Sequence, residues 1–192
     1  MPSRDNGPLG RQVAKLRLAR RQILWLAGLV ALGLALQWGV GEDSRDMVSI
    51  PLAVALAWAA LIDLDRLRLP DVITLPLIVF GIAWAFESGR PAPEASLIGA
   101  MSGYGVFAGL AWAYRRFRGY EGLGLGDAKL FAAAGAWLGW VALPLVALIA
   151  SGAGLAAALI YQVGRKKAVR NEAVAFGPFI AAGFWAVWLL SN

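Results

Sequence analysis

Two groups of acidic residues lie at the ends of long apolar runs. A carboxylate near hydrocarbon costs free energy, so residues of this kind are candidates for a functional role. The first is Asp63-Leu64-Asp65, which closes one apolar run just before a basic turn. The second is Asp127, which follows alternating glycines in the run Gly122-Leu123-Gly124-Leu125-Gly126-Asp127-Ala128-Lys129. Two carboxyl groups on separate helices can serve as general acid and general base in peptide-bond hydrolysis. The pair therefore indicates a hydrolase embedded in a bilayer.

The composition predicts the elements that must position these carboxyls. Hydrophobic residues make up 59% of the 192-residue chain, and charged residues make up 16%. A soluble domain carries about 25% charged residues. We therefore expect an all-α fold, a polytopic integral membrane bundle of about six to seven transmembrane helices. A basic cytoplasmic tail over residues 1–22 would precede a transmembrane domain over residues 23–192.

Seven apolar segments are expected to form the helices. The fifth is the shortest, so it should tilt or begin within the membrane. The segments run over Ile23–Val40, Met47–Ile62, Val72–Phe86, Ser96–Tyr114, Ala128–Leu138, Val141–Val163 and Val174–Leu190.

The basic residues predict the orientation of these segments. They gather before the first segment and after the second, fourth and sixth, whereas the alternate loops are mostly acidic. By the positive-inside rule, the N-terminus is cytoplasmic, and Asp63, Asp65, Asp71 and Asp127 lie at the cytoplasmic face. The net charge of +6 then reflects topology and contact with membrane lipid. We expect no nucleic-acid partner, because no basic soluble domain is available to bind one.

Missing residue types exclude several mechanisms. The chain has no cysteine and no histidine. Thiol nucleophiles, Ser-His-Asp arrangements and the His-Glu-x-x-His zinc motif are therefore excluded. We expect no metal and no cofactor, and proton transfer would use Asp, Glu, Lys or Tyr.

The first acidic site has a structural alternative to catalysis. A carboxylate near a helix C-terminus opposes the macrodipole, so Asp63 is a poor structural choice there. Its alternative is an ion pair with Arg66 or Arg68, and this is the favoured interpretation for Asp65. Pro70 should break the helix, and Asp71 is placed to cap the next one.

The second acidic site also has a structural alternative. Gly124 and Gly126 would let the backbone approach a bound peptide closely. Asp127 could instead be the N-cap of the fifth helix. Lys129 could reach the lipid headgroups, hold substrate or tune Asp127.

Other glycines have structural interpretations. On the fourth segment, the small-residue spacing of Gly99, Gly103, Gly105 and Gly109 predicts close helix packing. Gly177-Pro178 should kink or break the last helix.

These residues together resemble the type IV prepilin peptidase family, the GxGD aspartic proteases of bacterial membranes. The resemblance lies in Gly124–Asp127 with Lys129 and Glu121, in the Asp63-to-Pro70 spacing followed by Asp71, and in Phe176-Gly177-Pro178-Phe179. It extends from about Met47 to the end of the chain. It implies that Asp63 and Asp127 are the catalytic dyad, supported by the other residues of these motifs.

The resemblance also implies a substrate and a variant of the family. The substrate would be a type IV prepilin or pseudopilin precursor, with a short basic leader cut just after a glycine and before an apolar helix. Long members carry an N-terminal domain with paired Cys-x-x-Cys motifs that is associated with N-methylation. Because this chain has no cysteine, it is similar to the short form, and methyltransferase activity is not expected. The oligomeric state stays open.

Two functions from other classes compete with this one. In a small proton- or cation-coupled transporter, Asp63 and Asp127 would carry the ion, but such proteins usually have inverted repeats and none is evident here. A catalytically silent scaffold for pilus assembly would have no need to retain both aspartates and the glycines.

Overall fold

The computed structural model describes residues 44–118, 124–164 and 175–191. The chain divides into two compact units, Met1–Ile50 and Pro51–Asn192. Only the opening turns of one helix are described in the first unit, so the fold below is that of the second. The predicted segment Ile23–Val40 and the predicted tail lie outside the described residues.

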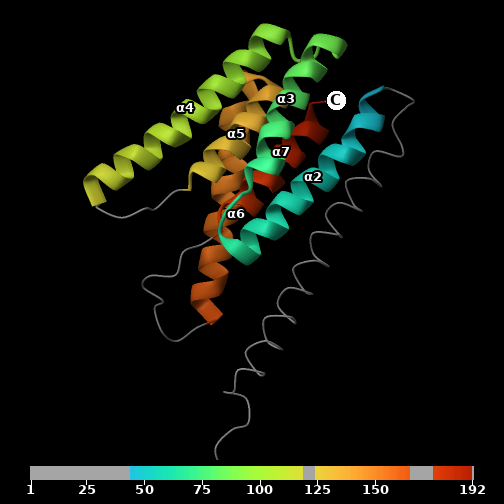
Figure 1. Ribbon diagram of the computed structural model, residues 1–192. Helices are drawn as coiled ribbons and strands as arrows, with labels where there is room; N and C mark the ends of the chain where they lie inside the picture. The colour runs from blue at the N-terminus through green and yellow to red at the C-terminus, as the bar shows by residue number, and fades with distance from the viewer. Residues whose placement is uncertain (1–43, 119–123, 165–174, 192) are drawn as a thin grey trace, which may run out of the picture. The chain divides into compact units, whose positions relative to one another are not determined.

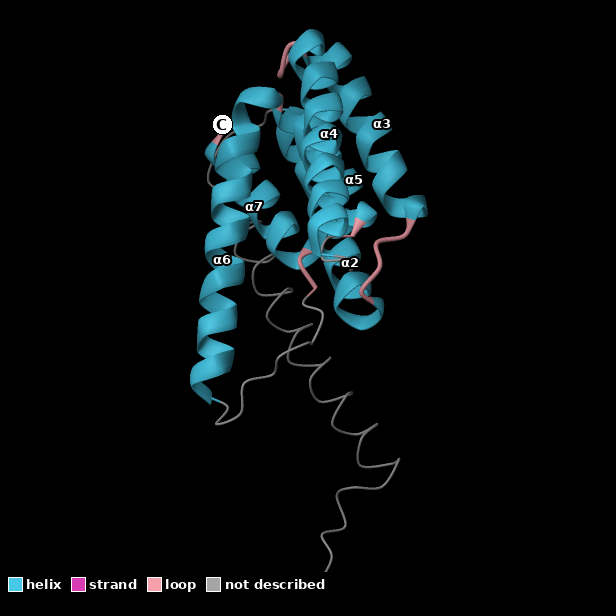
Figure 2. Cartoon of the chain, turned by 90° about the vertical axis from the view of Figure 1, so that its left-hand side faces the viewer, coloured by secondary structure: helices cyan, strands magenta, loops and turns pink. Residues whose placement is uncertain are grey.

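The described residues form helices and no strand, in agreement with the predicted all-α class (Figure 1 and Figure 2). Six α-helices and one short 3₁₀ helix match the second to seventh predicted segments. Their bounds are α2 Ser44–Arg66, α3 Asp71–Ser88, α4 Pro93–Arg118, α5 Leu125–Leu138, η2 Trp140–Ala142, α6 Leu143–Gly164 and α7 Gly177–Leu190.

Four helices are long and apolar enough to cross a membrane by length and composition, which makes this a multi-pass membrane protein. These candidate spans are Val48–Arg66, Asp71–Ser88, Pro93–Phe117 and Trp140–Ile160. Helix α5 has 14 residues, so it is about 21 Å long at 1.5 Å per residue. It is shorter than the hydrocarbon core, which is about 30 Å thick, as is α7 with its 14 residues; the tilt of α5, or its start within the membrane, stays a prediction.

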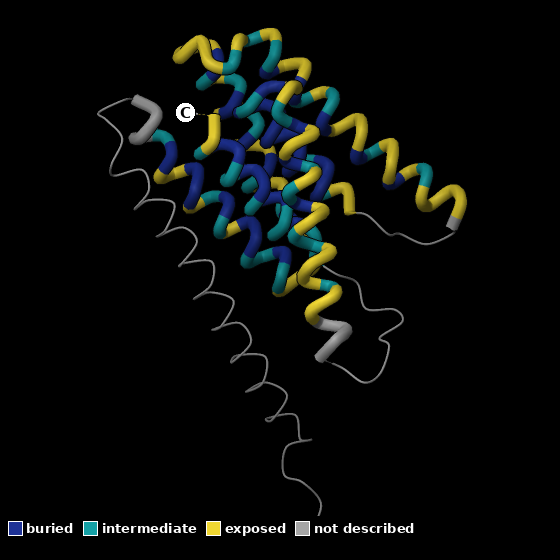
Figure 3. Tube along the Cα trace, turned by 180° about the vertical axis from the view of Figure 1, so that it is seen from behind, coloured by how far each residue is buried: buried dark blue, intermediate teal, exposed yellow. Residues whose placement is uncertain are grey.

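Helix α5 forms the centre of the second unit and packs against α3, α4, α6 and α7 (Figure 1). Ten of its residues, from Asp127 to Trp137 with Lys129 excepted, are buried. The Trp137 indole N–H donates to the carbonyl of Leu77 on α3 at 2.7 Å, and the Ser96 hydroxyl on α4 donates to the carbonyl of Ala136 at 2.6 Å. Figure 3 shows the buried residues on the inward faces and the exposed ones along the outer part of α4. The helix that carries Asp127 is thus held by its neighbours on several sides.

Glycines allow α4 and α5 to approach closely, which confirms half of the packing prediction. A Cβ at Gly99 would collide with the backbone of Gly135, and one at Gly103 would lie 2.8 Å from the carbonyl oxygen of Phe131. The prediction is wrong for Gly105 and Gly109, whose Cβ positions have nothing within 4 Å. Gly105 is two positions after Gly103, so it and Gly109 lie on a different, exposed face of α4.

Alanine substitutions on α4 test this contact. Gly99→Ala should lower the free energy of unfolding by roughly 1–3 kcal/mol, because its Cβ meets backbone atoms that no side-chain rotation can move away. Gly105→Ala is the matched control on the same helix; it should be neutral or stabilise by up to about 1 kcal/mol through helix propensity. Thermal unfolding in detergent, followed by tryptophan fluorescence, measures both. Equal melting temperatures for the two variants would contradict the observed packing.

Candidate active site

Asp63 lies in the last turn of α2, where it is 5% exposed. The backbone N–H of Gly177, the first residue of α7, donates a hydrogen bond to its Oδ2 at 3.0 Å. The N-cap of α7 is Phe176, which provides no side-chain hydrogen bond. Asp63 therefore supplies an acceptor to the start of another helix, where free N–H groups and the positive end of the helix dipole favour an anion.

This arrangement decides between the two interpretations of Asp63. In the described part of the chain, Asp63 forms no ion pair with Arg66 or Arg68, both of which are exposed. Asp65 is also exposed and has no ion pair there, so its favoured ion-pair interpretation is wrong as well. The unfavourable dipole of α2 at Asp63 is offset by the favourable dipole of α7.

Asp127 lies in the first turn of α5 and is 8% exposed. It is the third helical residue, and Gly124 is the N-cap. The N-cap alternative for Asp127 is therefore wrong. Its carboxylate accepts a hydrogen bond from the backbone N–H of Gly124, and the Asp127 N–H donates to the Gly124 carbonyl at 3.1 Å. This reaching back to the N-cap N–H is the second half of a capping box.

The two carboxyl groups are close enough to interact electrostatically. Leu69, which is buried in the turn between α2 and α3, contacts the backbone segments beside both. A Cβ at Gly126 would lie 2.9 Å from the Leu69 Cβ, and one at Gly177 would lie 2.7 Å from Asp63 Oδ2 and 3.2 Å from Leu69 Cδ1. The site thus needs glycine at both positions, because the backbone itself forms its walls.

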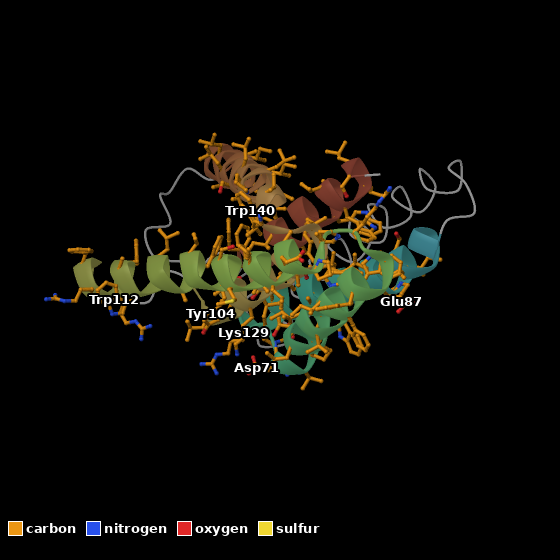
Figure 4. The ribbon with its side chains drawn as sticks, turned by 90° about the horizontal axis from the view of Figure 1, so that it is seen from above. Asp71, Glu87, Tyr104, Trp112, Lys129 and Trp140 are labelled. Atoms are coloured by element: carbon orange, nitrogen blue, oxygen red, sulfur yellow. The ribbon has the colours of Figure 1, made fainter. Side chains whose placement is uncertain are left out.

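Lys129 and Asp71, both predicted as supporting residues, form an ion pair with Nζ and Oδ1 2.5 Å apart. Figure 4 shows the two side chains next to each other at one edge of the structure. The predicted cap at Asp71 is wrong: Pro70 is the N-cap of α3, Asp71 is the first helical residue, and no side-chain cap hydrogen bond forms. Pro70 was predicted to break the preceding helix. Helix α2 ends at Arg66, and Pro70 closes the turn after it in an extended conformation, without an N–H that could continue a helix.

The remaining site predictions have different outcomes. Glu121 lies outside the described residues. Gly177-Pro178 was predicted to kink or break the last helix: there is no kink, but the helix begins only at Gly177, with Pro178 in its first turn, so residues 175 and 176 are outside it. Sequence reasoning missed the Gly177 N–H as a partner of Asp63. Its signal was the apolar Phe176–Phe179 patch with a glycine before a proline, but nothing in the patch pointed to Asp63.

An aromatic cluster lies next to the site. The rings of Phe107 on α4 and Phe131 on α5 have centroids 4.2 Å apart, and Phe107 and Phe176 are 6.5 Å apart. Phe131 lies one turn after Asp127, and Phe176 precedes Gly177. These rings connect the two backbone segments that hold the carboxyls. Within the described residues, no group of three or more acidic, histidine or cysteine side chains could hold a metal.

Comparison with known proteins gives the family. Residues 50–159 match the type IV leader peptidase family. The chain belongs to that family. The match includes Asp63, Asp71, Asp127 and Lys129, while Gly177 lies beyond it.

Individual relatives agree with this assignment. The chain is 39% identical over 166 residues to a prepilin leader peptidase/N-methyltransferase of Aeromonas hydrophila, covering 85% of this chain and 54% of the relative. It is 38% identical over 174 residues to one of Dickeya chrysanthemi, covering 91% and 56%, and 40% identical over 124 residues to one of Escherichia coli, covering 65% and 54%. The chain spans about half the length of these curated relatives. No solved structure shows a significant match to it.

The contact between Gly177 and Asp63 predicts that a larger side chain at position 177 lowers the stability of the protein. Gly177→Ala should lower the melting temperature by several degrees, because its Cβ would lie 2.7 Å from Asp63 Oδ2. Gly154→Ala on α6 is the control, since its Cβ would lie 3.5 Å from the rings of Phe176 and Phe179, an ordinary contact distance. Thermal unfolding of the purified variants compares them. A Gly177→Ala protein as stable as Gly154→Ala would mean that α7 does not begin against Asp63.

Proposed function

We propose that this chain is a membrane-embedded aspartic endopeptidase that removes the short basic leader of type IV prepilin or pseudopilin precursors. The observation that carries the proposal is the pair of buried carboxyls, Asp63 and Asp127, brought together from α2 and α5. Membership of the type IV leader peptidase family supports the reaction class. The names of the relatives support the choice of substrate.

The chemistry follows from two carboxyls that cannot both ionise easily at short separation. They share a proton and titrate as a pair. The ionised member takes a proton from water while the water oxygen bonds to the scissile carbonyl carbon. The protonated member polarises the carbonyl oxygen and later protonates the leaving amine, so that the peptide bond breaks without a covalent enzyme intermediate.

Each carboxyl also accepts a backbone N–H, from Gly177 and from Gly124 respectively. These donors fix the carboxyl orientation without adding a side chain that could compete for the proton. A pre-oriented pair does not have to reorganise when the reaction begins. Gly126 and Gly177 are not open to a substrate peptide, contrary to the expectation for Gly126, because Leu69 and Asp63 fill the space beside them.

The proposed location is a bacterial inner membrane, with the aspartate site at the cytoplasmic face and the N-terminus on the same side. The charges of the described residues support this orientation. Arg66, Arg68, Arg115 and Arg116 lie on the ends of α2 and α4 and on the turn beside the aspartates. At the opposite end, Arg90 lies in the turn between α3 and α4, with Glu87 in the last turn of α3 and Glu94 in the first turn of α4.

Cleavage of a candidate prepilin from the same genome tests the dyad. Asp63→Asn and Asp127→Asn should each lower the cleavage rate by about a hundredfold or more, because each removes one partner of the acid–base pair. Asp65→Asn, an exposed acid two residues from Asp63, is the matched control and should keep most of the activity. Co-expression and the shift in gel mobility of the prepilin provide the measurement. Unchanged cleavage by either dyad variant would exclude this mechanism.

Single cysteines in this cysteine-free chain test the orientation. On intact cells, Glu87→Cys at the end of α3 should react with a membrane-impermeant thiol reagent, while Arg116→Cys near the end of α4 should not. Both should react once the membrane is permeabilised, which controls for expression and accessibility. The reverse pattern would put the aspartates on the far side from a leader peptide that has not crossed the membrane, and the prepilin substrate would have to be abandoned.

A further inference from the structure

The ion pair between Lys129 and Asp71 links helix α5, which carries Asp127, to the start of helix α3. Lys129 is two residues after Asp127 on α5, and Asp71 is the first residue of α3. The lysine side chain is 26% exposed and the aspartate side chain 57%. Exposed pairs contribute little to the stability of a fold. This pair is therefore expected to affect the position of the neighbouring segments rather than the stability of the whole fold.

The turn from Leu67 to Pro70 is the short connection between Asp63 on α2 and Asp71 on α3. It is tied to α2 by the N–H of Leu67, which donates to the carbonyl of Asp63 at 2.8 Å. Leu67 has a φ of 53°, a left-handed conformation that a leucine rarely adopts. Something beyond local preference must therefore hold the turn in place.

The turn is held against α5 at two points. Leu69 packs so closely on Gly126 that a Cβ there would lie 2.9 Å from its own Cβ. Just beyond Pro70, Asp71 pairs with Lys129. One contact lies one residue before Asp127 on α5, and the other lies two residues after it. The position of the turn, and with it the end of α2 that carries Asp63, is thus fixed relative to Asp127.

From this geometry we propose that Lys129 and Asp71 are positioning residues, which clamp the α2–α3 turn to α5 and set the separation of the Asp63 and Asp127 carboxyls. The inference rests on the proposed function. Residues two apart on a helix do not face each other, so Lys129 and Asp127 point in different directions. Lys129 points to α3, and its effect on the dyad is transmitted through the turn.

The first experiment uses near-isosteric variants that keep the fold. Asp71→Asn and Lys129→Gln should each lower kcat for prepilin cleavage on the order of tenfold with little change in KM, because small misplacement of reacting groups costs rate. The double variant should lose no more than either single one, since both remove the same contact. Glu94→Gln, another exposed acid in the first turn of a helix but at the opposite turn, is the control and should behave like the unmodified protein.

The second experiment replaces the ion pair by a covalent link. In this cysteine-free chain, Asp71→Cys with Lys129→Cys can be joined by a short bifunctional methanethiosulfonate reagent. The double-cysteine protein should be slow before treatment and should regain most of its kcat when cross-linked, while each single-cysteine variant should not respond. Reduction of the link should abolish the gain.

The outcomes separate this inference from the proposed function. If the unmodified protein does not cut prepilin, the proposed function fails. If it cuts prepilin and the Asp71 and Lys129 variants are equally active, the positioning role is overturned. Cross-linking that forms without restoring kcat would also overturn it, because Lys129 would then be needed for its charge rather than for its contact with Asp71. A rise in KM with unchanged kcat would mean that the two residues bind substrate instead.

Discussion

Two carboxyl groups buried close together in an apolar bundle must each find a hydrogen-bond donor, and this requirement explains much of the arrangement around them. An unsatisfied buried charge would cost several kcal/mol. The donors come from helix starts: Gly177 opens α7 and reaches Asp63, while Gly124 precedes α5 and reaches Asp127. Helix N-termini are suited to this because they have free N–H groups and a favourable dipole.

That solution requires α5 and α7 to begin inside the bundle rather than at its edge. Both are 14 residues long, whereas the neighbouring α4 and α6 have 26 and 22. Both helices can be measured from the contact of Phe107 with Phe131. From there α4 continues for about 16 Å to its end at Arg118, whereas the start of α5 is only about 9 Å away. The carboxyls therefore lie deeper in the bundle than the ends of the longer helices, where they have little exposure to solvent.

The sequence allowed the helices, their order and the two acidic sites to be predicted, because apolar runs and charge clusters are local signals. The prediction of close packing held for Gly99 and Gly103 but not for Gly105 and Gly109, because the latter two lie on the exposed face of α4 rather than on the buried face that contacts α5. Asp71 was predicted as a cap, yet it pairs with a lysine 58 positions away. Gly177 was predicted to kink or break a helix; it begins one, and its N–H bonds to Asp63 from 114 positions away. In each of these cases several local roles were compatible with the sequence pattern. The tertiary contacts that decide between them involve residues far away in the chain, so they could not be predicted from that pattern.

The charges around the site constrain how a basic leader could be recognised under the proposed function. Arg66, Arg68 and Arg116 are exposed on the elements that surround the aspartates, and they would repel a positively charged segment. Of the nearby exposed acids, Asp71 is already paired with Lys129, which leaves Asp65 against several arginines. Charge attraction is therefore a poor source of affinity at this end of the bundle. The apolar segment that follows the cleavage point can supply that affinity instead, because it contacts lipid and helix faces and carries no charge to be repelled. In that arrangement the basic leader is tolerated rather than attracted, and the membrane-embedded part of the substrate determines which bond meets the two carboxyls.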